Sequence, residues 1–342
     1  MRWKIFTLNN RTLCNLAALP RVIKAIRKDL KVQQEYISYK IDPVIEDLLS
    51  SADTHLSPKE IHKIKNYYGL AVPAILAESF VLLQGRKLSE TERWIATCLG
   101  AMTGLFDDFF DVAGLSKEMV KEKIFSPEIS VDRPANEQLF SRFYREVLKH
   151  SSAPEEITKN LYEVYLHQVK SLEQEDGTLN EEQTWDVTQA KGGSSLLFYR
   201  SGIMPQPPVQ EITFLFNVGA LMQVANDIFD VYKDREAGVR TGLMFLKNID
   251  PFRERFNKDL NNLFLQSHSL SYKRKAIKHF MERINLAVFC RALVALDQLK
   301  MLEKKTNGEF LLEKYTRKDL ICDMDTKKNM LRSAAYFLNY SY

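Results

Sequence analysis

The sequence predicts an all-α protein, and three observations support this fold class. Apolar residues recur at helical spacing along most of the chain, whereas the alternation typical of strands is nearly absent. Helix-start signals recur, and turn-forming residues separate the periodic segments. The chain has 342 residues, of which 45% are hydrophobic, so it can bury a sizeable core. We expect about ten helices joined by mostly short loops in one helical bundle.

Three helix starts carry side chains that can cap a first turn, two of them as a reciprocal pair three residues apart and one beside a proline. They are Ser57-Pro58, Ser89 with Glu92 (opening a helix over 88–112), and Asn180 with Gln183. Breakers are expected at Asp132-Arg133-Pro134, Gln174–Gly177, Pro205–Pro208 and Asp250-Pro251. Segments 70–84, 93–112 and 211–232 are apolar nearly all round, which predicts interior helices. Acidic residues inside such helices are therefore the informative ones.

Composition excludes some classes of protein. With 48 Lys+Arg against 44 Asp+Glu, the net charge of +4 does not favour nucleic-acid binding. The four cysteines are scattered, which predicts reduced thiols. The N-terminus lacks a signal peptide, and the longest apolar run, 70–83, is too short for a membrane span. We expect a cytoplasmic protein without a transmembrane segment, and a homodimer is left open.

The first acidic motif is Asp107-Asp108-Phe109-Phe110-Asp111, at the end of an apolar helix. Asp107 and Asp111 point ~40° apart, and Asp108 lies ~60° from Asp111. Such clustered carboxylates repel one another unless a cation compensates. Arg93 is the only lysine or arginine between positions 87 and 117. The missing cation is expected to be a metal, and oxygen-only ligands favour Mg²⁺. The alternative is an exposed helix end on which the acids are solvated, and the apolar residues interleaved with them disfavour it.

The second motif is a stripe of oxygen-bearing side chains. Asn226, Asp230 and Asp234 are spaced four and four, so the stripe drifts only ~80° over two helical turns. Asn226 and Asp230 are embedded among apolar residues, which an amphipathic helix leaving the core does not explain. Lys233 and Arg235 beside the stripe could hold an anion that bridges to the metals. The pattern indicates a cation site.

Together these motifs resemble the class I terpenoid synthase superfamily. Asp107-Asp108-x-x-Asp111 is similar to its aspartate-rich motif, and Asn226-Asp227-x-x-Asp230-x-x-x-Asp234 to the second motif of its cyclases. The chain has Asp where cyclases often carry Ser or Thr, and Asp for the usual Glu. The resemblance implies a helical bundle with a central active-site cleft over residues 56–342. We expect residues 1–55, which match no motif of the family, to form a basic helical segment that packs on the bundle or caps it. The resemblance also implies three Mg²⁺ ions that grip a prenyl diphosphate, with Asp107 and Asn226 essential for turnover.

The resemblance suggests further diphosphate ligands. Lys191 precedes Gly192-Gly193 inside a helix that two glycines should break, as cyclase helices break in this region, although close helix packing is an equal explanation. Arg200 is a candidate for the same anion. Arg332 and Tyr336 loosely resemble the Arg-Tyr pair of some cyclases.

The resemblance also separates branches of the family. Chain-elongating synthases bind a second diphosphate with cations that stretches 66–73 and 111–116 lack. We therefore expect a terpene synthase, a carbon–oxygen lyase acting on a phosphate ester, that yields a cyclic or linear terpene. The alternatives are a trans-prenyl diphosphate synthase, a head-to-head squalene- or phytoene-type prenyltransferase, and a non-catalytic partner subunit.

Small residues before both motifs suggest a deep pocket. On the helix of Asp107 these are Ala96, Gly100, Thr103 and Gly104, and across the cleft Gly219, with Met222 filling part of the space. We expect a substrate of twenty carbons or more. The alternative is that the glycines permit close helix approach and leave no cavity.

Overall fold

The protein is described here by a computed structural model that covers residues 10–50, 55–111, 116–127 and 133–340. Most of these residues are helical, and no strand occurs among them. This confirms the predicted all-α class. The finer prediction, a class I terpenoid synthase bundle, stays a prediction.

The chain divides into two compact units, each formed by discontinuous segments. Unit 1 comprises Met1–Ala25, Lys170–Gly193 and Phe216–Tyr342, and unit 2 comprises Ile26–Val169 and Ser194–Leu215. Four long helices have residues in both: α1 (Asn10–Lys40), α9 (Pro154–Ser171), α10 (Glu181–Ser201) and α11 (Val209–Ala237). The predicted boundary at residue 55 stays a prediction.

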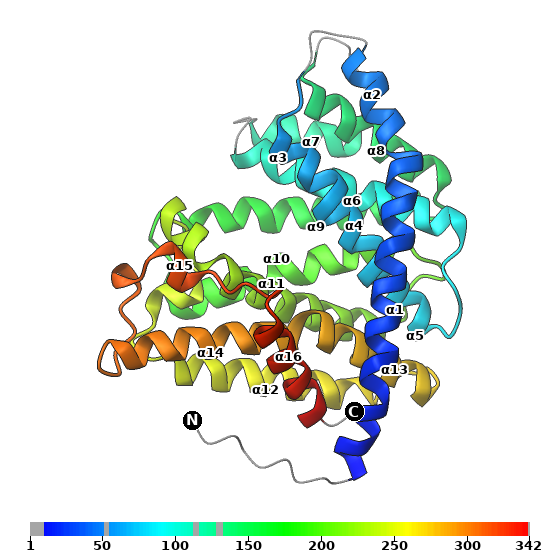
Figure 1. Ribbon diagram of the computed structural model, residues 1–342. Helices are drawn as coiled ribbons and strands as arrows, with labels where there is room; N and C mark the ends of the chain where they lie inside the picture. Colours follow the sequence, from blue (N-terminus) through cyan, green and yellow to red (C-terminus); the bar gives the residue numbers. More distant parts are fainter. Residues whose placement is uncertain (1–9, 51–54, 112–115, 128–132, 341–342) are drawn as a thin grey trace. The chain divides into compact units, whose positions relative to one another are not determined.

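Unit 2 is organised around one apolar helix, α6, which packs against α8, α4 and two π-helical segments (Figure 1). Phe106 and Phe109 of α6 contact Phe140 of α8, with ring centroids 5.8 and 5.1 Å apart. The elements are α2 (Asp42–Ser50), α3 (Pro58–His62), η1 (Lys63–Tyr67), α4 (Tyr68–Ala71), η2 (Val72–Ala77), α5 (Glu78–Leu83), α6 (Glu90–Asp111), α7 (Lys117–Phe125) and α8 (Ala135–His150).

In unit 1, α14 packs against both α12 and α16 (Figure 1). Asn15 of α1 ties the two chain ends together, since its side-chain amide donates to the Tyr340 carbonyl at 2.6 Å. The elements are η3 (Leu172–Gln174), η4 (Gly242–Phe245), α12 (Ile249–Ser267), α13 (Arg274–Ile284), η5 (Asn285–Phe289), α14 (Cys290–Lys305), η6 (Leu312–Lys314), α15 (Arg317–Leu320) and α16 (Lys327–Asn339).

All three predicted helix starts are confirmed by reciprocal hydrogen bonds. The Glu60 amide donates to Ser57 Oγ and the Ser57 amide to Glu60 Oε2, at 3.2 and 2.7 Å. The pairs Ser89/Glu92 and Asn180/Gln183 show the same two-way bonding. Each pair satisfies backbone donors that a helix N-terminus leaves without partners.

One predicted breaker lies inside a helix. Asp250 and Pro251 belong to the first turn of α12, and the helix begins just before them, with Asn248 as its N-cap. The Asn248 side chain accepts from the Asp250 amide at 2.9 Å. Proline is tolerated in a first turn because its missing N–H has no helical acceptor there.

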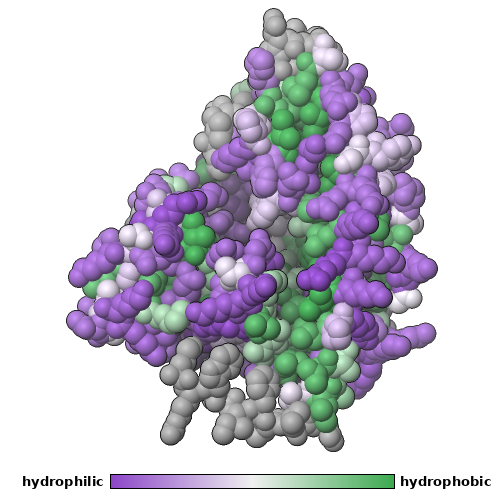
Figure 2. Space-filling view, in the orientation of Figure 1, coloured by the Kyte–Doolittle hydropathy of each residue, from purple (hydrophilic) through white to green (hydrophobic). Residues whose placement is uncertain are grey.

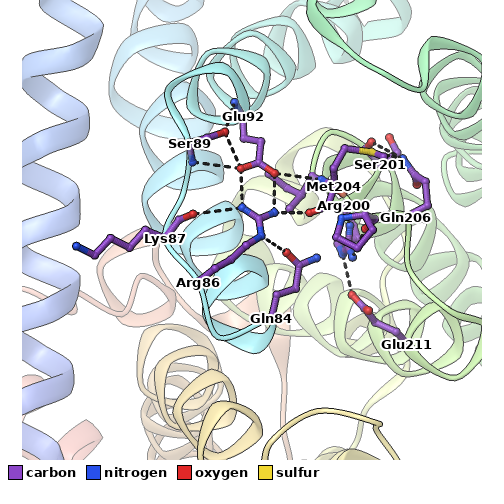
Figure 3. A network of polar contacts seen from close by, with 12 residues as sticks. Gln84, Arg86, Lys87, Ser89, Glu92, Arg200, Ser201, Met204, Gln206 and Glu211 are labelled. Atoms are coloured by element: carbon purple, nitrogen blue, oxygen red, sulfur yellow. Dashed lines mark hydrogen bonds and ion pairs between the residues drawn. The ribbon is translucent and has the colours of Figure 1, made fainter.

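A polar network fixes the 200–206 turn to the start of α6 within unit 2 (Figure 3). Arg86 forms a two-bond pair with Glu92 at 2.6 and 2.7 Å, and the Met204 amide donates to Glu92 at 3.1 Å. Burial opposes ionisation of Glu92, but hydrogen bonds from Arg86 and Ser89 outweigh it and lower the pKa of Glu92 to about 2. The carboxylate is therefore a permanent structural acceptor.

Two helical stretches among the described residues, Pro58–Leu83 and Val209–Ala237, are long and apolar enough to cross a membrane, and 56% of each apolar window is buried. Core helices of soluble proteins share these properties, so the expected absence of a membrane span stays a prediction. Figure 2 shows a face on which hydrophilic residues predominate and hydrophobic residues form smaller patches.

Candidate metal and diphosphate site

The first acidic motif lies at the carboxyl end of α6, in unit 2. Asp107 is half-buried and accepts a hydrogen bond from the Tyr68 hydroxyl at 3.2 Å. The negative charge of Asp107 raises the pKa of Tyr68 well above its ordinary value, so Tyr68 stays protonated and donates. The side chain of Asp111 lies outside the described residues.

The second carboxylate of this motif already has a protein cation. Asp108 is buried, and its Oδ1 lies 2.6 Å from Lys63 Nζ. The prediction that the compensating cation must be a metal is therefore wrong for Asp108. Lys63 comes from a segment 45 residues earlier, which a search along the motif's own helix does not reach. Asp108 does not fit the role of a metal ligand.

The second motif lies on α11, in unit 1. Asn226, Asp230 and Asp234 are all half-buried. Asn226 Nδ2 donates to Asp230 Oδ2 at 3.2 Å, so the first two members are in contact. Their donor set is one amide oxygen and two carboxylates, which suits a hard divalent cation such as Mg²⁺.

The acidic residues of α11 repel one another. Burial and the charges of Asp227 and Asp230 raise the pKa of Asp234 to about 8. Burial also raises the pKa of Asp227 to about 6, against the lowering effects of Gln223 and Lys191. A divalent cation would relieve this repulsion. The second motif therefore fits the metal that the resemblance implies.

Asp227, which sequence reasoning left without a role, anchors α11 to α10. It is buried and accepts hydrogen bonds from Thr188 at 3.2 Å and from Gln223 at 3.1 Å. Its place between Asn226 and Asp230 in the motif gave no sign of this, because the partner hydroxyl lies on another helix.

No group of three or more His, Cys, Asp and Glu side chains is arranged to hold a metal ion in the part of the chain that the structure describes. The two motifs belong to different units. The predicted cleft with three Mg²⁺ ions between them stays a prediction.

Two of the four predicted diphosphate ligands lie beside the second motif. Lys191 of α10 is near enough for its charge to lower the pKa values of Asp227 and Asp234. Lys233 is 74% exposed, with Nζ 3.9 Å from Asp230 Oδ2. Their role as diphosphate ligands stays a prediction. Arg235 is bound instead to the Leu312 and Tyr315 carbonyls at 2.9 and 2.8 Å, where it holds the end of α11 to η6.

The fourth, Arg200, is a structural residue. Its side chain is fully buried, and Nε donates to Glu211 at 2.7 Å. The remaining nitrogens donate to the carbonyls of Ile203 and Pro205. With every side of the guanidinium held by protein, the assignment of Arg200 to the diphosphate is wrong.

The Gly192-Gly193 pair does not break its helix. α10 continues from Glu181 to Ser201, and both glycines face α11 within unit 1. A Cβ on Gly192 would lie 2.3 Å from the Gly219 carbonyl oxygen, and one on Gly193 would lie 2.5 Å from the Phe216 ring. The glycines serve close helix packing, and the expected break is a misreading of that packing.

Two of the predicted pocket glycines lie under close neighbours within unit 2. A Cβ on Gly100 would lie 2.5 Å from the Tyr68 carbonyl oxygen, and one on Gly104 would lie 2.8 Å from Lys63 Cβ. Gly219 is the neighbour of Gly192 described above. The contacts of Gly100 and Gly104 favour close packing, which is the alternative to a deep pocket.

The other predicted pocket residues give no sign of a cavity. Ala96 is 1% exposed and Met222 is half-buried. Thr103 donates to the Leu99 carbonyl at 2.8 Å and accepts from the Tyr199 hydroxyl at 3.1 Å. The argument for a substrate of twenty or more carbons loses its support.

A second charged cluster in unit 1 includes residues that the sequence did not single out. Arg332 and Tyr336 of α16 both bind Asp297 of α14, at 2.9 Å each. Arg253 of α12 donates to the same carboxylate and to the Tyr336 hydroxyl. Arg253 and Asp297 lie on different helices, 44 residues apart, so only the spacing of Arg332 and Tyr336 could have signalled the cluster.

Comparison with known proteins gives no match, either to a family model or to a curated protein. The assignment of function depends on the residues themselves.

Proposed function

We propose that the protein is a Mg²⁺-dependent enzyme that ionises an allylic prenyl diphosphate, as class I terpene synthases do. The observation that carries this proposal is the half-buried stripe of Asn226, Asp230 and Asp234, in which burial, together with the charges of Asp227 and Asp230, raises the pKa of Asp234 to about 8. A protein without a cation ligand has no need for such a costly arrangement. Because the glycine argument fails, the proposal names no chain length.

Mg²⁺ bound here would supply the positive charge that a departing diphosphate requires. The donors are Asn226 and Asp230, already in contact at 3.2 Å, together with Asp234. Lys191 and Lys233 add positive charge beside the stripe and would bind diphosphate oxygens. In the first motif, Asp107 is the carboxylate that fits, held by Tyr68.

The reaction is heterolysis of the allylic carbon–oxygen bond. Both bonding electrons leave with the diphosphate, and an allylic cation remains for cyclisation, proton loss or capture by water. The protein's part is electrostatic, because charge placed in advance where the leaving group develops its own charge lowers the barrier.

The use of one substrate, without a second diphosphate, is supported by how the lysines near 66–73 are used. Lys63 pairs with Asp108, and Lys65 pairs with Asp42 at 2.7 Å. Both cations beside this stretch are thus engaged by carboxylates. Residues 112–115, the other stretch expected to lack cations, lie outside the described residues.

The test is incubation of the purified chain with geranyl, farnesyl and geranylgeranyl diphosphate and Mg²⁺, followed by mass spectrometry of the products. We expect hydrocarbon or alcohol products and free diphosphate from one allylic substrate. An elongated diphosphate formed with added isopentenyl diphosphate would instead support a chain-elongating synthase. Absence of any turnover would support the non-catalytic partner subunit.

A further inference from the structure

A π-helical turn brings Lys63 and Tyr68 onto one face of their segment. Residues five apart on an α-helix point ~140° away from each other. In η1 (Lys63–Tyr67), however, the Tyr68 amide bonds to the Lys63 carbonyl, five residues back, so the two residues lie one above the other. The backbone at Tyr67, φ −119° and ψ −91°, is neither helical nor extended. Both side chains consequently reach α6, where Tyr68 binds Asp107 and Lys63 binds Asp108.

The glycines of α6 form the seat for this turn. Gly104 lies under the Lys63 stem, since a Cβ there would meet Lys63 Cβ at 2.8 Å and Cδ at 3.1 Å. Gly100 lies under the backbone of Tyr68 and Gly69. A Cβ on Gly100 would lie 2.5 Å from the Tyr68 carbonyl oxygen and 3.1 Å from Gly69 Cα. Any larger residue at either position would push the turn away from the acidic motif.

The Lys63–Asp108 pair is shielded from water. The side chains are 19% and 3% exposed, and the Nζ–Oδ1 distance is 2.6 Å. Asp108 Oδ2 is also buried and has no hydrogen-bond partner among the described residues. A carboxylate in this position depends on its one cation, because a buried charge without a partner is strongly destabilising.

We propose that Lys63 is the resident cation of the first acidic motif. It holds Asp108 out of metal coordination, and with Tyr68 it fixes Asp107 as the carboxylate that α6 presents to the metal. Lys63 and Tyr68 are thus positioning residues. The metal part of this inference rests on the proposed function, whereas the ion pair does not.

The ion pair is tested by melting temperatures of Lys63→Met, Asp108→Asn and the double variant. Lys63→Met keeps the stem over Gly104 and removes only the charge. We expect it to lower the melting temperature by several degrees, and we expect Asp108→Asn in the same chain to restore most of the loss. Lys65→Met, which breaks the more exposed pair with Asp42, is the matched control and should change little. Additive losses in the double variant would refute the pairing.

The positioning role is tested by titration with Mn²⁺ in the absence of substrate, with binding monitored by electron paramagnetic resonance. Asp107→Asn should lose a binding site, whereas Asp108→Asn should bind as the wild type does. Lys63→Met should bind Mn²⁺ severalfold more tightly, because Asp108 is released, and Lys63→Arg should restore wild-type affinity. Lost binding in Asp108→Asn would overturn the inference. Absence of Mn²⁺ binding by the wild type would refute the proposed function and the metal part together, while the melting temperatures would still decide the ion pair.

Discussion

Arg200→Met should unfold the protein more readily, and should do so for a reason unrelated to diphosphate. Arg200 and Glu211 are both fully buried and lie 2.7 Å apart. Removal of the guanidinium takes its ion-pair partner away from the buried Glu211 carboxylate, and the carbonyls of Ile203 and Pro205 lose a donor. Loss of one partner of a buried pair costs about 3–5 kcal/mol, a large fraction of the roughly 5–15 kcal/mol that stabilises a typical protein.

Urea denaturation of the variant measures this loss directly. The double variant Arg200→Met/Glu211→Leu should recover most of the stability, because apolar replacement of a whole buried pair is often neutral. Arg142→Met is the control. It breaks an exposed pair with Asp47 in the same unit, 2.8 Å apart, and should cost at most about 1 kcal/mol. A stable Arg200→Met variant with weakened diphosphate binding would refute the reasoning and restore the ligand role.

Three further predictions concern unit 1. Gly192→Ala should destabilise the protein by about 1–3 kcal/mol in urea titrations, because its Cβ would lie 2.3 Å from the Gly219 carbonyl oxygen. The pKa of Asp234 is raised to about 8 in the folded chain, which therefore keeps a proton that the unfolded chain releases near pH 4. The free energy of unfolding of the metal-free protein should consequently fall as the pH rises from about 4 to 8. Mg²⁺ should raise the melting temperature more at pH 8 than at pH 5. Asn226→Leu should lower Mg²⁺-dependent diphosphate release about a hundredfold or more with little change in melting temperature.

Local signals could be predicted from the sequence because their physics is local. The caps at Ser57, Ser89 and Asn180 each join residues three apart, and all three are confirmed. The stripe of Asn226 and Asp230 is of the same kind, since helical spacing alone brings those side chains into contact.

The structural role of these glycines cannot be predicted from the sequence, because it depends on the segment that faces each of them. From the sequence, Gly192 is equally consistent with a helix break and with a close contact between helices. The Gly219 carbonyl of α11, which faces it, shows that it makes a close contact. Gly100 and Gly104 could equally have opened a cavity or received a neighbouring segment. Spacing along one helix contains no information about what lies opposite.

The ion pair of Lys63 with Asp108 could not be predicted from the sequence, for two reasons. Lys63 is 45 residues from Asp108 in the chain, and it reaches α6 through a π-turn that helical periodicity does not anticipate. Arg200 was misjudged in the same way, because the Glu211 carboxylate that holds it belongs to a different helix.

Diphosphate release from an allylic prenyl diphosphate, followed against Mg²⁺ concentration in the wild type and in Asp230→Asn, tests the central claim most directly. The account predicts release that requires Mg²⁺ in the wild type, and a loss of about a hundredfold or more in the variant at unchanged melting temperature. Equal release by the two proteins, or release that does not depend on Mg²⁺, would contradict it.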